Sequence, residues 1–155
     1  MNHLIAEALL RPDQQAPNGL ADGIFASGVT TDVTNSGYIG AMGYGWAAGI
    51  EAYGVDSATV ANSGAIYAMA TDEYGQAFGI HATALPDGAV SASNDGSIEV
   101  VSSTGYGHSA GILALSGAGG VTVDNGGSIV ASGAYVYGIQ AQSAGLVDIT
   151  NAGSI

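Results

Sequence analysis

The sequence contains no cysteine and no lysine, and Arg11 is its only strongly basic residue. Without thiols the chain cannot form a disulfide, a zinc–thiolate site, an iron–sulfur cluster or a cysteine nucleophile. Thirteen acidic residues leave a net charge of -12, so little is available to neutralise the phosphates of nucleic acid or of an anionic membrane surface. No apolar run approaches the roughly 20 residues of a membrane span. We therefore expect no nucleic-acid partner and no membrane insertion.

Glycine, in contrast, is abundant, with 26 residues, and 47% of the chain is hydrophobic. Only three prolines are present and there is no Gly-X-Y period, which excludes a collagen-like chain. The hydrophobic content is too high for an intrinsically disordered one. The composition predicts a folded architecture that uses glycine repeatedly.

Two short motifs alternate along the chain, and each occurs five times. The first is Asn-x-Gly-x-Ile, with spacings of 27, 32, 31 and 26 residues, and the second is Gly-Ile-x-Ala. Strict alternation of two motifs indicates an internal repeat. The first motif begins at Asn35, Asn62, Asn94, Asn125 and Asn151, and the second at Gly23, Gly49, Gly79, Gly111 and Gly138.

Within each unit the hydrophobic pattern has a period of two, which predicts about three short strands separated by corners. A unit of this size cannot bury a core alone, but coils stacked about 4.8 Å apart can align their inward Ile, Val and Ala in columns. We predict an all-β fold, a parallel, right-handed β-helix or β-solenoid of about five coils of 26–32 residues. Asparagine tolerates a left-handed corner and glycine adds backbone freedom there. Stacked amides predict a structural ladder of Asn35, Asn62, Asn94, Asn125 and Asn151.

Residues 1–19 precede the repeat domain, which we place at residues 20–155. Asn2 can cap a short helix over Leu4–Leu10 that ends before Pro12. We expect this segment either to cap the end of the solenoid or to dock on another molecule. It lacks the basic start and the long apolar stretch of a secretion signal.

The repeat V-x-N-x-G-x-I-x-A followed by G-I-x-A resembles the β-solenoids of bacterial autotransporter passengers and filamentous-haemagglutinin-type adhesins. The resemblance covers roughly residues 20–155 and rests on motif positions such as Asn35, Gly37 and Ile39. It implies an extracellular or bacterial cell-surface location. It implies little about activity, because adhesins, enzymes and passive spacers share the scaffold.

The sequence offers few candidates for chemistry, and we predict no catalytic, cofactor-binding or metal residues. Gly107–Gly111 matches the G-x-S-x-G pattern of serine hydrolases around Ser109, but the same register in other repeats lacks serine. His81 is expected in register with Glu51 on the outer surface. The acids are expected to be scattered, which leaves no clustered pair for polysaccharide hydrolysis. A weak calcium site at Asp72–Glu73 is the alternative to a solvated acidic surface.

Aromatic residues recur at related positions before the second motif. A stacked ladder that stabilises a turn is one interpretation. The other is a stripe that binds carbohydrate or protein. The candidate stripe consists of Tyr44, Trp46, Tyr74, Tyr106, Tyr135 and Tyr137.

The sequence favours a non-enzymatic structural or surface protein, a rigid rod that stacks end to end into a fibre or forms part of a longer rod. The alternative is an adhesin-type module that binds carbohydrate or protein through its tyrosine-rich face. An enzyme acting on polysaccharide is a third hypothesis, which depends on the fold alone.

Overall fold

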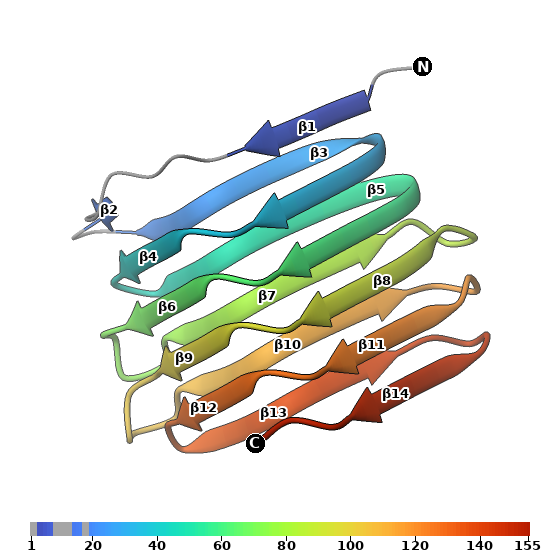
Figure 1. Cartoon of the computed structure of the whole chain (residues 1–155). Coiled ribbons are helices and arrows are strands. Elements are labelled where there is room, and N and C mark those ends of the chain that lie inside the picture. Colours follow the sequence, from blue (N-terminus) through green and yellow to red (C-terminus); the bar gives the residue numbers. More distant parts are fainter. Residues whose placement is uncertain (1–2, 8–13, 17–18) are drawn as a thin grey trace.

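The computed structural model describes residues 3–7, 14–16 and 19–155, and these form a parallel β-solenoid of about four turns (Figure 1). The all-β solenoid predicted from the repeats is confirmed. The five repeats complete about four turns, because the five corner asparagines bound four intervals. The described part of the chain contains no helix.

Each coil consists of three segments. In the coil formed by β5 and β6, the first segment runs from Trp46 to about Gly54 and the second ends at the corner Asn62. The third segment returns toward the next coil. In the first two coils the first two segments form one bent strand, and in later coils a loop separates them. The strands are β3 (Leu20–Asn35), β4 (Tyr38–Gly43), β5 (Trp46–Asn62), β6 (Ala65–Ala70), β7 (Gln76–Ala84), β8 (Ala89–Asn94), β9 (Ser97–Val101), β10 (His108–Ser116), β11 (Val121–Asn125), β12 (Ser128–Ser132), β13 (Tyr135–Gln142) and β14 (Val147–Asn151).

Every strand pairs in parallel with its equivalent in the adjacent coil, and the motif residues align without exception. Ile50 lies opposite Ile80, and Asn62 lies opposite Asn94. The described strands form one sheet of nine and one of five. The register expected from the two motifs is therefore the register of the sheets.

The core consists of isoleucine, valine and alanine columns that run along the solenoid axis. Ile39, Ile66, Ile98 and Ile129 form one column, contributed by the Asn-x-Gly-x-Ile motif. All four are almost fully buried. The isoleucines of the second motif form a second column on the opposite wall.

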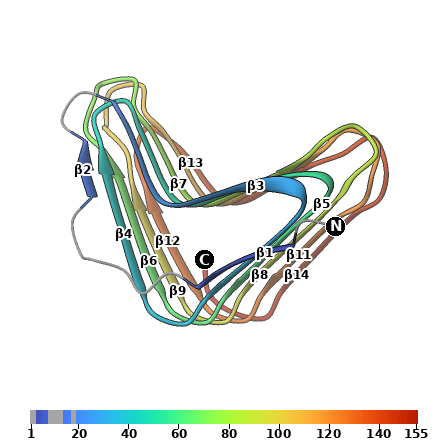
Figure 2. The same ribbon diagram turned by 90° about the horizontal axis from the view of Figure 1, so that it is seen from above.

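The two motifs meet across the interior, where each second-motif glycine packs against a first-motif isoleucine. A Cβ atom at Gly49 would collide with Cγ2 of Ile66 and would lie 2.7 Å from the carbonyl oxygen of Gly79 in the next coil. The same contact joins Gly79 to Ile98 and Gly111 to Ile129. The missing side chain lets the first segment bend inward onto the isoleucine, which produces the bent cross-section in Figure 2.

The corner glycines have a different role from the one expected. Among the described glycines only Gly133 has a positive φ, of 154°, so the corners do not use left-handed glycine. Instead, a Cβ at Gly96 would collide with the backbone of Ser63 and Gly64 in the coil before it. These glycines allow close stacking of successive corners.

The five corner asparagines form a continuous ladder. In the first four, Nδ2 donates a hydrogen bond to Oδ1 of the asparagine in the next coil at 2.7 Å. Nδ2 of Asn62 also donates to the carbonyl oxygen of Gly64 at 3.1 Å. Asn35, Asn62, Asn94 and Asn125 are buried, so the ladder supplies partners to amides that would otherwise be costly to bury.

The helix predicted over Leu4–Leu10 is wrong where the chain is described. Residues His3–Glu7 form strand β1, which pairs with Thr30–Thr34 of β3, and β2 (Gln14–Ala16) pairs with β4. An isolated helix this short is marginal in water, whereas the edge of β3 offers unpaired backbone groups. The remainder of the predicted helix, and its capping residue Asn2, lie outside the described residues.

In the residues that the structure describes, no helix has the length and apolar character needed to cross a membrane.

We predict that Gly79→Ala lowers the free energy of unfolding by at least about 2 kcal/mol, because the added Cβ overpacks the interior against Ile98. Gly45→Ala is the matched control, since a Cβ there meets nothing within 4 Å, and we expect it to change stability by less than about 1 kcal/mol. Urea unfolding of both variants tests this. Equal losses at the two positions would contradict the packing role of Gly79.

Candidate ligand-binding face

The inward bend of the first segment creates a concave outer face along the solenoid. Strict alternation along a strand would place every second side chain on this face. At the bend, however, Gly49 and Ile50 both face the interior, so Ala48 and Glu51 both face outward. The strands β3, β5, β7, β10 and β13 line the inside of the bend (Figure 2).

Four columns of side chains make up this concave face. Their residues, in order of coil, are Leu20, Trp46, Gln76, His108 and Tyr135; Asp22, Ala48, Phe78, Ala110 and Tyr137; Phe25, Glu51, His81, Leu113 and Gln140; and Ser27, Tyr53, Thr83, Leu115 and Gln142.

The middle of the concave face is apolar and forms a second hydrophobic cluster, separate from the core. Ala48, Phe78, Ala110 and Leu113 are buried there, and Trp46 packs against them. The rings of Trp46 and Phe78 lie 4.7 Å apart. Residues on the outside of the solenoid are therefore shielded from water by the curvature of the sheet.

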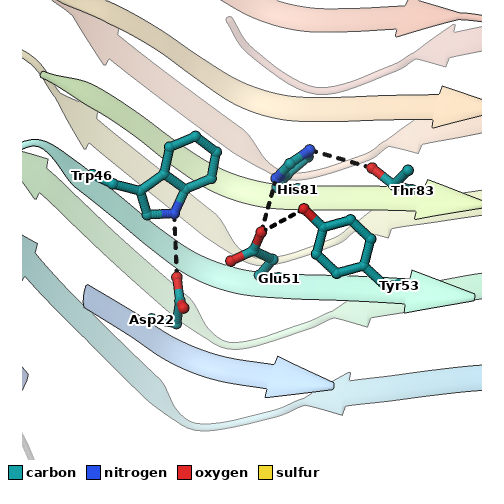
Figure 3. A network of polar contacts seen from close by, with 6 residues as sticks. All are labelled: Asp22, Trp46, Glu51, Tyr53, His81 and Thr83. Atoms are coloured by element: carbon teal, nitrogen blue, oxygen red, sulfur yellow. Dashed lines mark hydrogen bonds and ion pairs between the residues drawn. The ribbon is translucent and has the colours of Figure 1, made fainter. Parts of the chain in front are cut away.

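A polar network lies beside this cluster (Figure 3). The indole nitrogen of Trp46 donates to Oδ1 of Asp22 at 3.3 Å, and the hydroxyl of Tyr53 donates to Oε1 of Glu51 at 2.8 Å. Nδ1 of His81 lies 3.5 Å from the same Oε1. Its Nε2 is 3.3 Å from the hydroxyl of Thr83. The network thus joins three successive coils.

Asp22 and Glu51 form a carboxyl pair in this network, which corrects the expectation that no acids cluster. Burial raises the pKa of Asp22 to about 6, and the neighbouring Glu51 carboxyl adds to the rise. The indole of Trp46 and the imidazole of His81 oppose it. The two acids come from different coils and columns, and the outward shift at Gly49 is what brings them together.

His81 is opposite Glu51 as the register predicts, but neither side chain is at an open surface. Each is only 7% exposed. Burial lowers the pKa of His81, and the charge of Asp22 opposes this. The imidazole is therefore mainly neutral near pH 7.

The six residues of the candidate aromatic stripe occupy two places. Tyr44, Tyr74 and Tyr106 lie in the turns before the concave strands, where Tyr74 and Tyr106 stack at 5.2 Å with an interplanar angle of 7°. Trp46, Tyr135 and Tyr137 lie on the concave face itself. Three residues of the candidate stripe thus lie along one edge of the concave face, and the other three lie on the face itself.

The serine-hydrolase pattern has no catalytic geometry. Ser109 is fully buried, and its hydroxyl donates to the carbonyl oxygen of Ser132 at 3.0 Å. His108 points to the opposite side of the strand, where its ring stacks on Tyr135 at 4.8 Å. At Asp72–Glu73, Asp72 accepts a backbone hydrogen bond from Tyr74. Within the described residues no group of three or more His, Asp or Glu side chains is placed to hold a metal ion.

Two hollows open on the concave face. One, of about 350 Å³, lies over β10, and we name it the β10 hollow. The other, of about 690 Å³, lies beside Tyr53, between β3 and the loop that follows β7, and its lining is mainly apolar. The β10 hollow is lined by Gln76, Phe78, His108, Ser109, Ala110, Leu113, Leu115, Tyr137, Gln140 and Gln142. The second is lined by Ser27, Gly28, Val29, Tyr53, Gly54, Val55 and Leu85.

We predict that Asp22→Asn stabilises the protein at pH 7.5 more than at pH 4. The folded pKa of Asp22, about 6, exceeds its usual 3.8. The protonated Asp22 carboxyl therefore contributes its full stabilisation to the folded state below pH 3.8, and this contribution is lost as the pH rises through about 6. Asparagine removes that loss. The lowered pKa of His81 acts in the opposite sense, since its contribution is lost as the pH falls below its usual 6.5.

Urea unfolding between pH 4 and pH 8 measures the effect. Asp56→Asn is the control, because it removes one acid from an exposed position of strand β5 and changes the net charge equally. The same pH dependence in both variants would show that net charge, and not the buried pair, controls the stability.

Comparison of the chain with protein-family models, with curated proteins and with solved structures found no match.

Proposed function

We propose that this chain is a non-enzymatic structural module of an extracellular or bacterial surface rod. In this proposal its β-solenoid stacks end to end on a second copy or forms part of a longer rod. The observation that carries the proposal is the uniform coil-to-coil interface. The same backbone pairings, isoleucine column and asparagine ladder recur from coil to coil, so one more coil adds the same interface.

In this proposal the coil of β13 and β14 forms one side of the junction between copies. Ile149 is 47% exposed, whereas Val123, its equivalent one coil earlier, is fully buried. Val147 and Ile155 are exposed in the same way. A further coil laid on this surface would bury all three. An end-to-end contact of this kind does not close, so it propagates into a filament.

The composition and the resemblance to autotransporter and haemagglutinin-type repeats support the proposed location. Like the members of those secreted families, this chain lacks cysteine. The net charge of -12 would limit sideways association between rods.

We expect Ile149→Lys to prevent filament growth, because an ammonium group would be buried without a partner at each junction. Val130→Lys is the control, since Val130 is exposed on the outer wall of the preceding coil. Negative-stain microscopy and sedimentation at increasing concentration provide the measurement. A monodisperse monomer at high concentration in the unsubstituted chain would contradict the end-to-end proposal.

A second function, adhesin-type recognition, is favoured by the exposed aromatic residues. Tyr74 and Tyr106 are 63% and 52% exposed, and they stack in parallel on adjacent coils. Exposed flat rings of this kind can anchor a partner or a sugar. The solenoid would then hold the recognition surface at a fixed place on the rod.

We expect the double variant Tyr74→Ser/Tyr106→Ser to lose binding to immobilised glycans or host-surface proteins without a change in rod length. Tyr38→Ser, an exposed tyrosine on another wall, serves as the control. If the double variant binds as strongly as the unsubstituted chain, this pair of tyrosines is not the anchor.

A further inference from the structure

The β10 hollow lies where a small side chain separates two large aromatic ones in the same column. Ala110 lies between Phe78 in the coil before and Tyr137 in the coil after. Coils in a parallel sheet are about 4.8 Å apart, so Phe78 and Tyr137 are separated by roughly 9.6 Å along the axis. Between these two rings the column has a gap one coil deep. Ala110 and Leu113 belong to its lining, and both are already largely shielded from water by the apolar cluster.

The walls of the hollow supply hydrogen-bonding groups without fixed charge. Gln76 and His108 lie on one side, and Gln140 and Gln142 lie on the other. No Asp, Glu or Arg belongs to the lining. With a net charge of -12 for the whole chain, an anionic ligand is disfavoured and a neutral one is not.

The backbone around the hollow limits the type of ligand. β10 pairs with β7 on one side and with β13 on the other, so its backbone groups are already hydrogen-bonded. A peptide cannot bind there by adding a strand to the sheet, which is a common mode of peptide recognition. Recognition must come from side chains, and the side chains present are amides, an imidazole and aromatic rings.

We propose that the β10 hollow binds a neutral sugar residue of a glycan, with its ring against Tyr137, which is 44% exposed, and its hydroxyl groups on the glutamine amides. An apolar base with a few convergent polar groups is the usual design of a small-ligand site, and about 350 Å³ falls in the usual range of ~300–1,000 Å³. The exposed stack of His108 on Tyr135 extends the site at its rim. The inference rests on the adhesin-type recognition function proposed above and names its ligand class.

The test is binding of the full chain to an immobilised panel of neutral glycans built from hexoses and N-acetylhexosamines, with sialylated and uronic-acid glycans beside them. Calorimetry with the free oligosaccharide follows for each glycan that binds. We expect Ala110→Leu, which places a larger side chain between Phe78 and Tyr137, to weaken binding by at least about tenfold. We expect Gln140→Ala/Gln142→Ala to weaken it by about tenfold through lost hydrogen bonds.

One control and the glutamine variant separate binding from folding. Ser91→Ala/Thr122→Ala removes two exposed hydroxyls from another wall, and we expect it to bind as the unsubstituted chain does. The glutamine variant leaves Ala110 and the apolar cluster unchanged, so it remains informative if Ala110→Leu lowers the unfolding midpoint.

The outcomes distinguish this site from the wider proposal. Full binding by both hollow variants, together with loss in Tyr74→Ser/Tyr106→Ser, would keep the recognition function and overturn the β10 hollow as its site. If the chain binds only acidic glycans or only proteins, the neutral-sugar assignment is overturned. Failure of every glycan and protein probe would overturn both, and the filament measurement would be unaffected.

Discussion

The contact between the second-motif glycine and the first-motif isoleucine is the constraint on which the rest of this structure depends. At Gly49 the backbone lies so close to Ile66 and to Gly79 that no side chain fits. The contact recurs in each coil, which explains why the two motifs alternate. Each Asn-x-Gly-x-Ile supplies the isoleucine, and each Gly-Ile-x-Ala supplies the space for it. Repeated stacking of that one cross-section then aligns the asparagine ladder and the hydrophobic columns.

The same contact produces the concave face. Because the chain turns inward at Gly49, Ala48 and Glu51 both face outward, and the columns on either side of the bend are drawn together. This shields Trp46, Phe78 and Leu113 from water outside the main core. It also places the Asp22 carboxyl beside that of Glu51. A face that is curved, partly apolar and rich in amides and tyrosines is suited to ligand recognition. The uniform interface between coils is suited to the formation of a long rod.

The sequence was sufficient to predict the solenoid, the register and the identity of the inward isoleucines, because identical motifs must stack in identical positions. It was insufficient where the backbone departs from simple alternation. The outward shift at Gly49 has no signature in a period of two, so the Asp22–Glu51 pair and the burial of His81 were missed. The alignment of the second motifs places Glu51 opposite His81 and Gln140 opposite Leu113. It does not predict the curvature that shields these side chains from water. At His3–Glu7, pairing with β3 overrides a weak local helix preference.

A double-mutant cycle at Gly79 and Ile98 tests the central contact most directly. Ile98→Leu removes the Cγ2 methyl that a Cβ at residue 79 would strike, while it keeps the side-chain volume. The free energies of unfolding of the two single variants and the double variant give the coupling. We predict that Gly79→Ala costs at least about 1 kcal/mol less in the Ile98→Leu background than in the unsubstituted chain. An equal cost in both backgrounds would contradict the account.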